Sequence, residues 1–234
     1  MKQAALRSII MIITAALSFQ ACIDKDSYNS EYYPNAIVTV MPNDDNTSVR
    51  LQLDDKTSLW PVNLKKSPFG AKEVRAYVNY RRPTSEELEK GGILADIQNV
   101  YVNWLDSIRT KDMAVDTGSK ELNRKTYGND PLEIVGSWET CVEDGYLTVR
   151  FRTYWGNSGK HTLNLVHEAD DTDPYKITLF QDANGDEGRN VADATIAFRL
   201  DKLPSTGGEE VTLTLVWNSF IGEKTAKFKY ISRN

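Results

Sequence analysis

The chain has few of the side chains from which most catalytic and metal sites are built. Its 234 residues contain two cysteines, Cys22 and Cys141, and two histidines, His161 and His167. The histidines lie in one expected strand about 20 Å apart, so they cannot bind one metal ion together. No motif marks a nucleophile beside either of them. We therefore expect no catalytic residue, no metal ligand, no cofactor and no enzymatic activity.

The sequence also lacks a basic tract and a second long apolar run. Lysine and arginine number 28 against 33 acidic residues, which gives a formal net charge of −5. A mildly acidic chain without clustered cations argues against non-specific binding to nucleic acid. No segment after the N-terminal one is apolar enough over its length to cross a bilayer.

The N-terminus carries the most informative positive feature. Lys2 and Arg7 precede an apolar stretch over residues 8–19, and Cys22 follows closely. A basic region, a short apolar core and a processing site make up a secretory signal. The stretch is shorter than the roughly 20 residues that span a bilayer. We predict a signal peptide over residues 1–21 that is removed, and acylation of Cys22.

The residues before Cys22 leave a second processing site open. Ala21 is the small residue that lipoprotein processing favours, whereas Phe19 departs from the usual aliphatic residue. Cleavage after Ser18 by an ordinary signal peptidase is the alternative. With Cys22 acylated, Cys141 has no disulfide partner and is expected to be a buried, inert thiol. Without acylation, a bridge between the two cysteines is the other option.

Residues 22–34 are expected to form a lipid-carrying tether. Asp24 and Asp26 resemble the acidic residues that follow the acylated cysteine in surface-displayed lipoproteins of gut-type Bacteroidetes. A flexible solvated linker is the plain alternative. We expect the membrane to be one partner, through the lipid anchor. The expected location is the outer membrane or cell surface, with the periplasmic face as the alternative.

The C-terminal half alternates apolar and polar residues. Leu147, Val149 and Phe151 share one face of an expected strand, while Thr148 and Arg150 share the other. Such alternation is typical of antiparallel strands with one buried face. Six such segments, separated by turns rich in glycine and asparagine, predict an antiparallel β-sandwich. The other expected inward positions are Leu163, Leu165, Ile177, Leu179, Ile196, Phe198, Leu200, Val211, Leu213, Leu215, Trp217, Ala226, Phe228 and Tyr230.

The N-terminal half is also rich in β-forming residues. A Ser/Thr cap, acidic residues and a final glycine predict a short helix over 83–91. Five strands with a helix before the last suit a small OB-type barrel. We place this barrel at residues 35–110 and the sandwich at 111–234, with the boundary between Ser107 and Asp130. The five expected strands are 36–41, 49–53, 59–62, 74–80 and 97–104.

Several segments resemble the NigD-like lipoproteins of Bacteroidetes. They are Leu51–Pro61, Val78–Tyr80, Asp96–Val100, Gly128–Pro131, Asp144–Leu147 and Phe220–Lys224. The resemblance implies an N-terminal OB domain followed by a C-terminal β-sandwich. It also implies a non-enzymatic envelope lipoprotein that binds another protein or neutralises a bacteriocin. The shared motifs are structural, so no functional residue is carried over.

Aromatic side chains suggest two other kinds of ligand. Trp60, Trp138 and Trp155 could stack on sugar rings, and Trp155 is the best candidate because glycine-rich residues flank it. Packing in the core is the alternative for each. Trp155 supports a second hypothesis, a glycan-binding accessory protein of a polysaccharide system. A nucleic-acid-binding face on the barrel is a further hypothesis. The balanced charge of the barrel argues against it, and so does the predicted export of the protein away from most nucleic acid. Such a face would consist of Lys72, Arg75, Tyr77, Tyr80, Arg81, Arg82, Tyr101 and Trp104.

One acidic segment resembles a calcium loop. Asp182, Asn184, Asp186 and Asp193 match four ligand positions of the EF-hand. Glu187 stands where that loop requires glycine, and no helices are expected beside it. We interpret the segment as a solvated β-turn.

Overall fold

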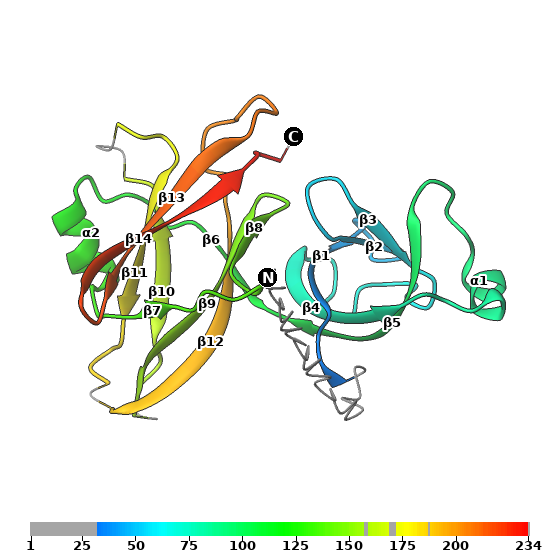
Figure 1. The fold of residues 1–234 in the computed structure, drawn as a ribbon, viewed down its shortest axis with the longest axis horizontal. Coiled ribbons are helices and arrows are strands. Elements are labelled where there is room, and N and C mark those ends of the chain that lie inside the picture. Colours follow the sequence, from blue (N-terminus) through cyan, green and yellow to red (C-terminus); the bar gives the residue numbers. More distant parts are fainter. Residues whose placement is uncertain (1–31, 157–158, 169–171, 187, 234) are drawn as a thin grey trace, which may run out of the picture. The chain divides into compact units, whose positions relative to one another are not determined.

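The computed structural model describes residues 32–156, 159–168, 172–186 and 188–233. The predicted signal peptide and Cys22 lie outside these residues. The described part contains fourteen strands and two short helices, so the all-β fold class predicted from the sequence is confirmed (Figure 1). No helix among the described residues is long and apolar enough to cross a membrane.

Five strands close into the N-terminal barrel, in the order β1-β2-β3-β5-β4. Every pairing is antiparallel except that of β3 with β5. Val38, Leu51 and Val78 lie in the barrel core and are fully buried. The five predicted strands are confirmed, with small shifts at their ends. They are β1 (Ala36–Pro42), β2 (Val49–Gln52), β3 (Ser58–Pro61), β4 (Val74–Arg81) and β5 (Gln98–Ser107).

The helix predicted before the last barrel strand is α1 (Ser85–Gly91). The Thr84 side chain accepts a hydrogen bond from the backbone of Glu87, and the Glu87 carboxylate accepts one from the backbone of Thr84. These reciprocal bonds satisfy amides that the first turn leaves without helical partners. Hydrogen bonds from Arg81, and next from the Thr84 backbone, lower the pKa of Glu87 to about 2.

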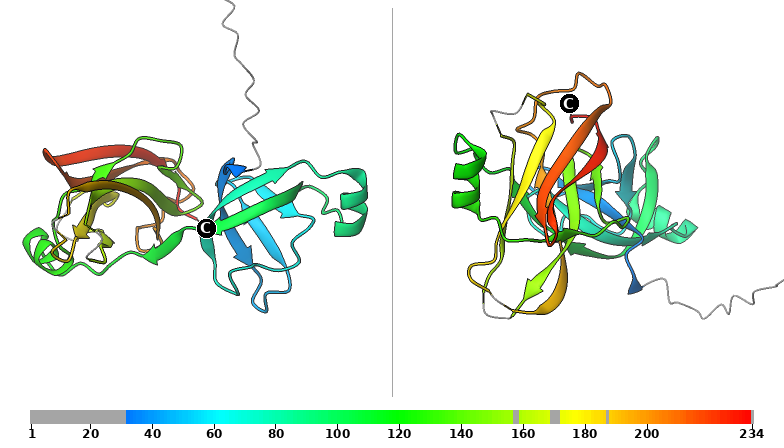
Figure 2. Two further views of the ribbon diagram at one scale, coloured as in Figure 1. Left: turned by 90° about the horizontal axis from the view of Figure 1, so that it is seen from below. Right: turned by 60° about the vertical axis from the view of Figure 1, so that its left-hand side comes forward.

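Two sheets pack face to face in the C-terminal sandwich (Figure 2). One has the strand order β10-β11-β13-β14, and the other has β6-β12-β9-β7 with β8 paired to β9. The pairings of β11 with β13 and of β12 with β6 are parallel, which the apolar pattern does not reveal. The strands are β6 (Arg109–Asp112), β7 (Glu133–Ile134), β8 (Cys141–Glu143), β9 (Tyr146–Trp155), β10 (Thr162–Val166), β11 (Lys176–Asp182), β12 (Asn190–Arg199), β13 (Val211–Ser219) and β14 (Gly222–Tyr230).

The alternation predicted for the sandwich is confirmed in its core. Leu147 and Val149 of β9, Phe198 of β12, and Leu213 and Leu215 of β13 are completely buried. They belong to one cluster that the inward residues of both sheets form together. Burial of such side chains is the dominant favourable term in folding, so this cluster holds the two sheets together.

The structure contains a helix that the sequence analysis missed, α2 (Lys120–Tyr127). It starts at Ser119, whose side chain caps the first turn, and it ends at Gly128 with φ of 85°. A Cβ atom at Gly128 would lie 2.4 Å from the carbonyl oxygen of Gln181, so glycine is required where the chain approaches β11. The one buried residue of the helix is the polar Asn123. An amphipathic pattern could not reveal a helix that buries no apolar side chain.

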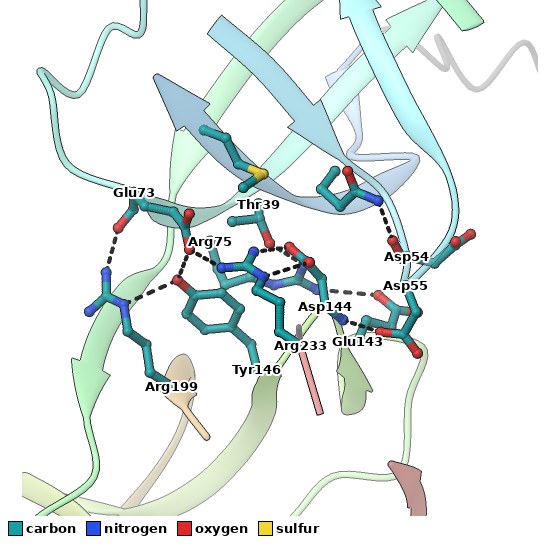
Figure 3. A network of polar contacts seen from close by, with 12 residues as sticks. Thr39, Asp54, Asp55, Glu73, Arg75, Glu143, Asp144, Tyr146, Arg199 and Arg233 are labelled. Carbon is teal, nitrogen blue, oxygen red and sulfur yellow. Dashed lines mark hydrogen bonds and ion pairs between the residues drawn. The ribbon is translucent and has the colours of Figure 1, made fainter. Parts of the chain in front are cut away.

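The barrel and the sandwich meet through a network of polar groups around Arg75, Glu143 and Tyr146, which we call the junction network (Figure 3). Arg75 on β4 lies at its centre, with a side chain that is 0% exposed. Its guanidinium donates to Thr39 Oγ1 of the barrel at 3.0 Å and to Glu143 Oε2 on β8 at 3.2 Å. A buried cation requires such partners, so Arg75 ties the barrel to the sandwich.

Tyr146 at the start of β9 has three guanidinium groups around its ring. Those of Arg75, Arg199 and Arg233 lie 5.8, 5.7 and 5.4 Å from the ring centroid, within the range of cation–π attraction. The Tyr146 hydroxyl donates to Glu73 and accepts a hydrogen bond from Arg199 Nε at 3.1 Å. Burial, and next the hydrogen bond to Glu73, raise the pKa of Tyr146. The hydroxyl therefore stays protonated and acts as a donor in the network.

Cys141 lies beside this network on β8. Its sulfur is 3.6 Å from Glu143 Oε2. Burial, and next the charge of Glu143, raise the pKa of Cys141 to about 12. A thiol with such a pKa is protonated at neutral pH and is a weak nucleophile, which agrees with the inert thiol expected from the sequence.

Replacing Arg75 with Met is expected to lower the free energy of unfolding by about 3 kcal/mol, measured by urea denaturation. The substitution keeps the apolar volume but removes the charge that pairs with Glu143. The Glu143 side chain is 37% exposed, so water can partly solvate its charge in the variant. The loss of unfolding free energy should therefore lie at the low end of the range that is typical when one partner of a buried ion pair is removed. Adding Glu143→Gln should recover part of the stability. A loss below about 1 kcal/mol, as for exposed pairs, would show that the network does not stabilise the junction.

Candidate functional site

A cleft of about 510 Å³ opens between the two sheets of the sandwich, at the edge that β6 and β10 form. We call it the inter-sheet cleft. Its volume falls within the roughly 300–1,000 Å³ of sites for small ligands. It is lined by Arg109, Lys111, Phe151, Thr153, Trp155, Lys160, His161, Thr162, Leu163, Ala192, Asp193, Ala194, Thr195 and Ile196.

Small side chains on β12 create this cleft. Along the inward face of β12, Phe198 and Ile196 are buried in the sandwich core, and Ala194 and Ala192 follow. Ala194 is exposed although it lines the cleft, because its methyl group does not fill the space between the sheets. Phe151 of β9 forms an apolar wall beside it. The side chains of the sandwich core are therefore not closely packed at the cleft.

Three cations surround the cleft. Arg109 and Lys111 come from β6, and Lys160 precedes β10. Lys111 Nζ donates to the carbonyl oxygen of Leu163 at 2.5 Å and to Asn164 Oδ1 at 2.9 Å. Burial, and next the charges of Arg109 and Lys160, lower the pKa of Lys111. The three positive charges are thus close enough to influence one another.

Trp155 and His161 form the end of the cleft beside the β11–β12 turn. Their ring centroids are 4.9 Å apart. The His161 side chain is 5% exposed, and its Nε2 lies 3.4 Å from Asp186 Oδ2. Asp186 also accepts hydrogen bonds from the backbone of Gly156 and Gly188, each at 2.9 Å. These contacts fix the Asp186 carboxylate and hold the imidazole against Trp155.

The acidic segment compared with a calcium loop does not gather its side chains in one place. The Asp182 carboxylate accepts from the backbone of Asn184, and Asp193 pairs with Arg150 and Arg152 on β9. The backbone amide of Asp186 donates to the Ala183 carbonyl at 3.0 Å, which closes the β-turn that we expected. Among the described residues, no three His, Cys, Asp or Glu side chains are arranged as a metal site.

The other aromatic candidates lie elsewhere. Trp60 is half-buried on β3, and Trp138 is 53% exposed with its ring edge-on to Tyr77. Among the residues weighed for a nucleic-acid face, Arg75 is buried in the junction network, and Arg81 stacks on the Tyr101 ring at 4.1 Å. Of the three tryptophans considered for sugar stacking, Trp155 alone lines the inter-sheet cleft. Its contact with a ligand stays a prediction.

Sequence reasoning missed the cations and the two alanines of the cleft. Arg109 and Lys111 belong to β6, which pairs in parallel with β12, and this pairing joins residues far apart in the chain. A local signal existed at Ala192 and Ala194, where small residues continue a row that begins with Phe198 and Ile196. Such a break in a row of large inward residues indicates a gap in the core.

A second feature lies at one end of the sandwich, on the outer faces of β9 and β12 and in the β13–β14 turn. Val191 of β12 is the cross-strand neighbour of Tyr154 on β9, and the rings of Tyr154 and Phe220 are 4.7 Å apart. Ile221 follows in the β13–β14 turn and is 84% exposed. We call these four side chains the apolar tip patch. Tyr154, Val191 and Ile221 are exposed and Phe220 is half-buried, and exposed apolar side chains that adjoin one another are typical of surfaces that bind proteins.

A five-stranded barrel followed by a sandwich places the chain in a class of two-domain, all-β proteins. Residues 37–108 match the NigD-like N-terminal OB domain, and residues 114–230 match the NigD-like C-terminal beta sandwich domain. The chain therefore belongs to the NigD-like family, which confirms the resemblance seen in the sequence.

Solved structures share this fold. A protein from Parabacteroides distasonis described as toxin-related has a TM-score of 0.67 at 33% identity, over 84% of this chain and 92% of that one. A protein of unknown function from Bacteroides vulgatus has a TM-score of 0.61 at 24% identity, over 83% and 89%. A NigD-like immunity protein from Bacteroides caccae has a TM-score of 0.55 at 19% identity, over 86% and 99%. No curated protein matches this sequence.

Proposed function

We propose that this protein is a lipid-anchored binding module of the cell envelope. Its role would be to capture a partner protein, as an immunity protein captures a bacteriocin, without catalysing a reaction. The export signal that ends at Cys22 supports a location at the outer membrane or cell surface. The names of two relatives, a NigD-like immunity protein and a toxin-related protein, support the role. The observation that carries the proposal is the apolar tip patch, which offers a partner an exposed apolar anchor point.

Deletion of the gene is expected to sensitise cells to a toxin of a related strain, measured by survival in its culture supernatant. Wild-type protein should restore resistance. The double substitution Tyr154→Ser and Ile221→Ser should restore it at least about tenfold less well, because apolar anchors dominate the affinity of protein interfaces. Ile93→Ser is the matched control, since Ile93 is a similarly exposed isoleucine on the barrel side of the chain. A deletion strain that survives every such toxin as the parent does would contradict the immunity role.

A glycan-binding accessory protein is the second candidate, because Trp155 lies in the wall of the inter-sheet cleft. An aromatic ring in a cleft can stack on a sugar. This role predicts retardation of the protein in affinity gels that contain a polysaccharide, and loss of retardation in Trp155→Ala. Trp138→Ala serves as the control, because Trp138 is exposed outside the cleft. Equal retardation of both variants would exclude sugar binding at this site.

A further inference from the structure

The inter-sheet cleft combines an apolar interior with a positive rim, and this combination specifies a class of small ligand. We infer that it binds an amphipathic monoanion, in which a hydrocarbon body lies between the sheets and a carboxylate or sulfate head lies near Arg109, Lys111 and Lys160. The inference is independent of the proposed capture of a protein, because no residue of the apolar tip patch lines the inter-sheet cleft.

The interior of the cleft suits a hydrocarbon. Phe151, Leu163 and Ile196 supply large apolar side chains, and Ala192 and Ala194 leave the space beside them open. Removing apolar surface from water is favourable in proportion to its area. A hydrocarbon chain that enters the cleft fills the space beside the two alanines and so restores close packing.

The charges around the cleft favour an anion. Among the described lining residues, the one carboxylate is that of Asp193, and Arg150 and Arg152 on β9 already pair with it. The cations of the rim are therefore not balanced by an acid within the lining. A lysine ammonium has three donors, and two of those of Lys111 go to Leu163 and Asn164. The third remains for an anionic head, and hydrogen bonds between charged groups are strong.

A neutral sugar fits this lining less well. The hydroxyl groups of a sugar need hydrogen-bond partners when water is removed. The lining described above contains no asparagine, glutamine, serine or tyrosine. Thr153 Oγ1 already accepts a hydrogen bond from Gln181 at 2.8 Å. The charged groups of the cleft that no acid balances are Arg109, Lys111 and Lys160, and cations recognise charge rather than a pattern of hydroxyls.

The test compares octanoate with octanol, which have the same chain length but different head charge. Calorimetric titration uses the full mature chain with Cys22→Ser, so that no detergent competes for the site. Octanoate should bind on the order of tenfold more tightly than octanol. Arg109→Gln with Lys160→Gln should remove most of this preference. Lys125→Gln with Lys227→Gln is the matched control, because it removes two exposed charges outside the cleft and should leave both affinities unchanged.

A cleft-filling substitution provides a second, independent test. Ala194→Trp should abolish binding of both probes, while circular dichroism and thermal unfolding show that the sandwich is intact. If the wild-type chain binds the two probes equally, or if Ala194→Trp folds and still binds octanoate, the inference is overturned. Binding of neutral oligosaccharides in the cleft without binding of octanoate would also overturn it and would favour the glycan role. None of these results changes the survival assay, so failure of this inference is separable from failure of the immunity role.

Discussion

Replacing Cys22 with Ser is expected to move the protein completely from the membrane fraction to the soluble fraction. We predict that the Cys22 thiol accepts the lipid, and a serine at this position cannot be processed as a lipoprotein. Stable attachment requires more than one acyl chain or a second membrane signal. Fractionation followed by immunoblotting measures the change.

Cys141→Ser is the matched control for this prediction, because it removes the other cysteine without touching the signal. That variant should stay in the membrane fraction. Mass spectrometry of the mature N-terminus adds a second readout, since a chain that begins at Phe19 would show cleavage after Ser18. Retention of Cys22→Ser in washed membranes, or an unmodified N-terminus in the wild type, would refute lipid anchoring.

Replacing Phe198 with Ala is expected to lower the free energy of unfolding by about 3–5 kcal/mol. The Phe198 ring is completely buried where the two sheets of the sandwich pack together. Its removal costs the transfer free energy of the ring and leaves a cavity that the rigid sheets cannot close. Urea denaturation of the full mature chain, with Cys22→Ser in both proteins, measures the change.

Val191→Ala on the same strand is the control for this loss. Val191 is 58% exposed, and surface substitutions of this kind change stability by about 0.5 kcal/mol or less. The pair of variants therefore separates core packing from any general effect of altering β12. Similar losses from both substitutions would contradict the arrangement of inward and outward residues on this strand.

The parts of the fold that were predicted correctly depend on local rules. The alternation through Leu147, Val149 and Phe151 reports which face of a strand is buried, whatever its partner is. The Thr84 cap and the acidic first turn report the start of α1 by contacts within one helical turn. The helix α2 also has a local cap at Ser119 and a glycine at its end, but no apolar stripe accompanies them, since its buried residue is Asn123. Tertiary hydrogen bonds to Asp116 and Glu168 hold that side chain in place.

The candidate site was predicted in part. Trp155 could be chosen from the sequence because it is an aromatic residue flanked by a glycine-rich segment. Nothing local indicated that Arg109 and Lys111 of β6 would lie beside it, because strand pairing and sheet packing bring these residues together. The same holds for the junction network, where Arg75 and Glu143 are 68 positions apart.

The amino-acid sequence by itself determined the strands of the barrel, the inward faces of the sandwich and the membership of the family, and it alone predicts the export signal. These features follow from composition and from the spacing of residues over a few positions. Steric restrictions and the burial of apolar side chains act over that range and so determine the local structure. Tertiary structure decided the parallel pairings, the burial of Arg75, the inter-sheet cleft and the apolar tip patch. Each of these depends on contacts between segments that are distant in the chain, and such contacts exist only after the strands have paired and the sheets and the barrel have packed.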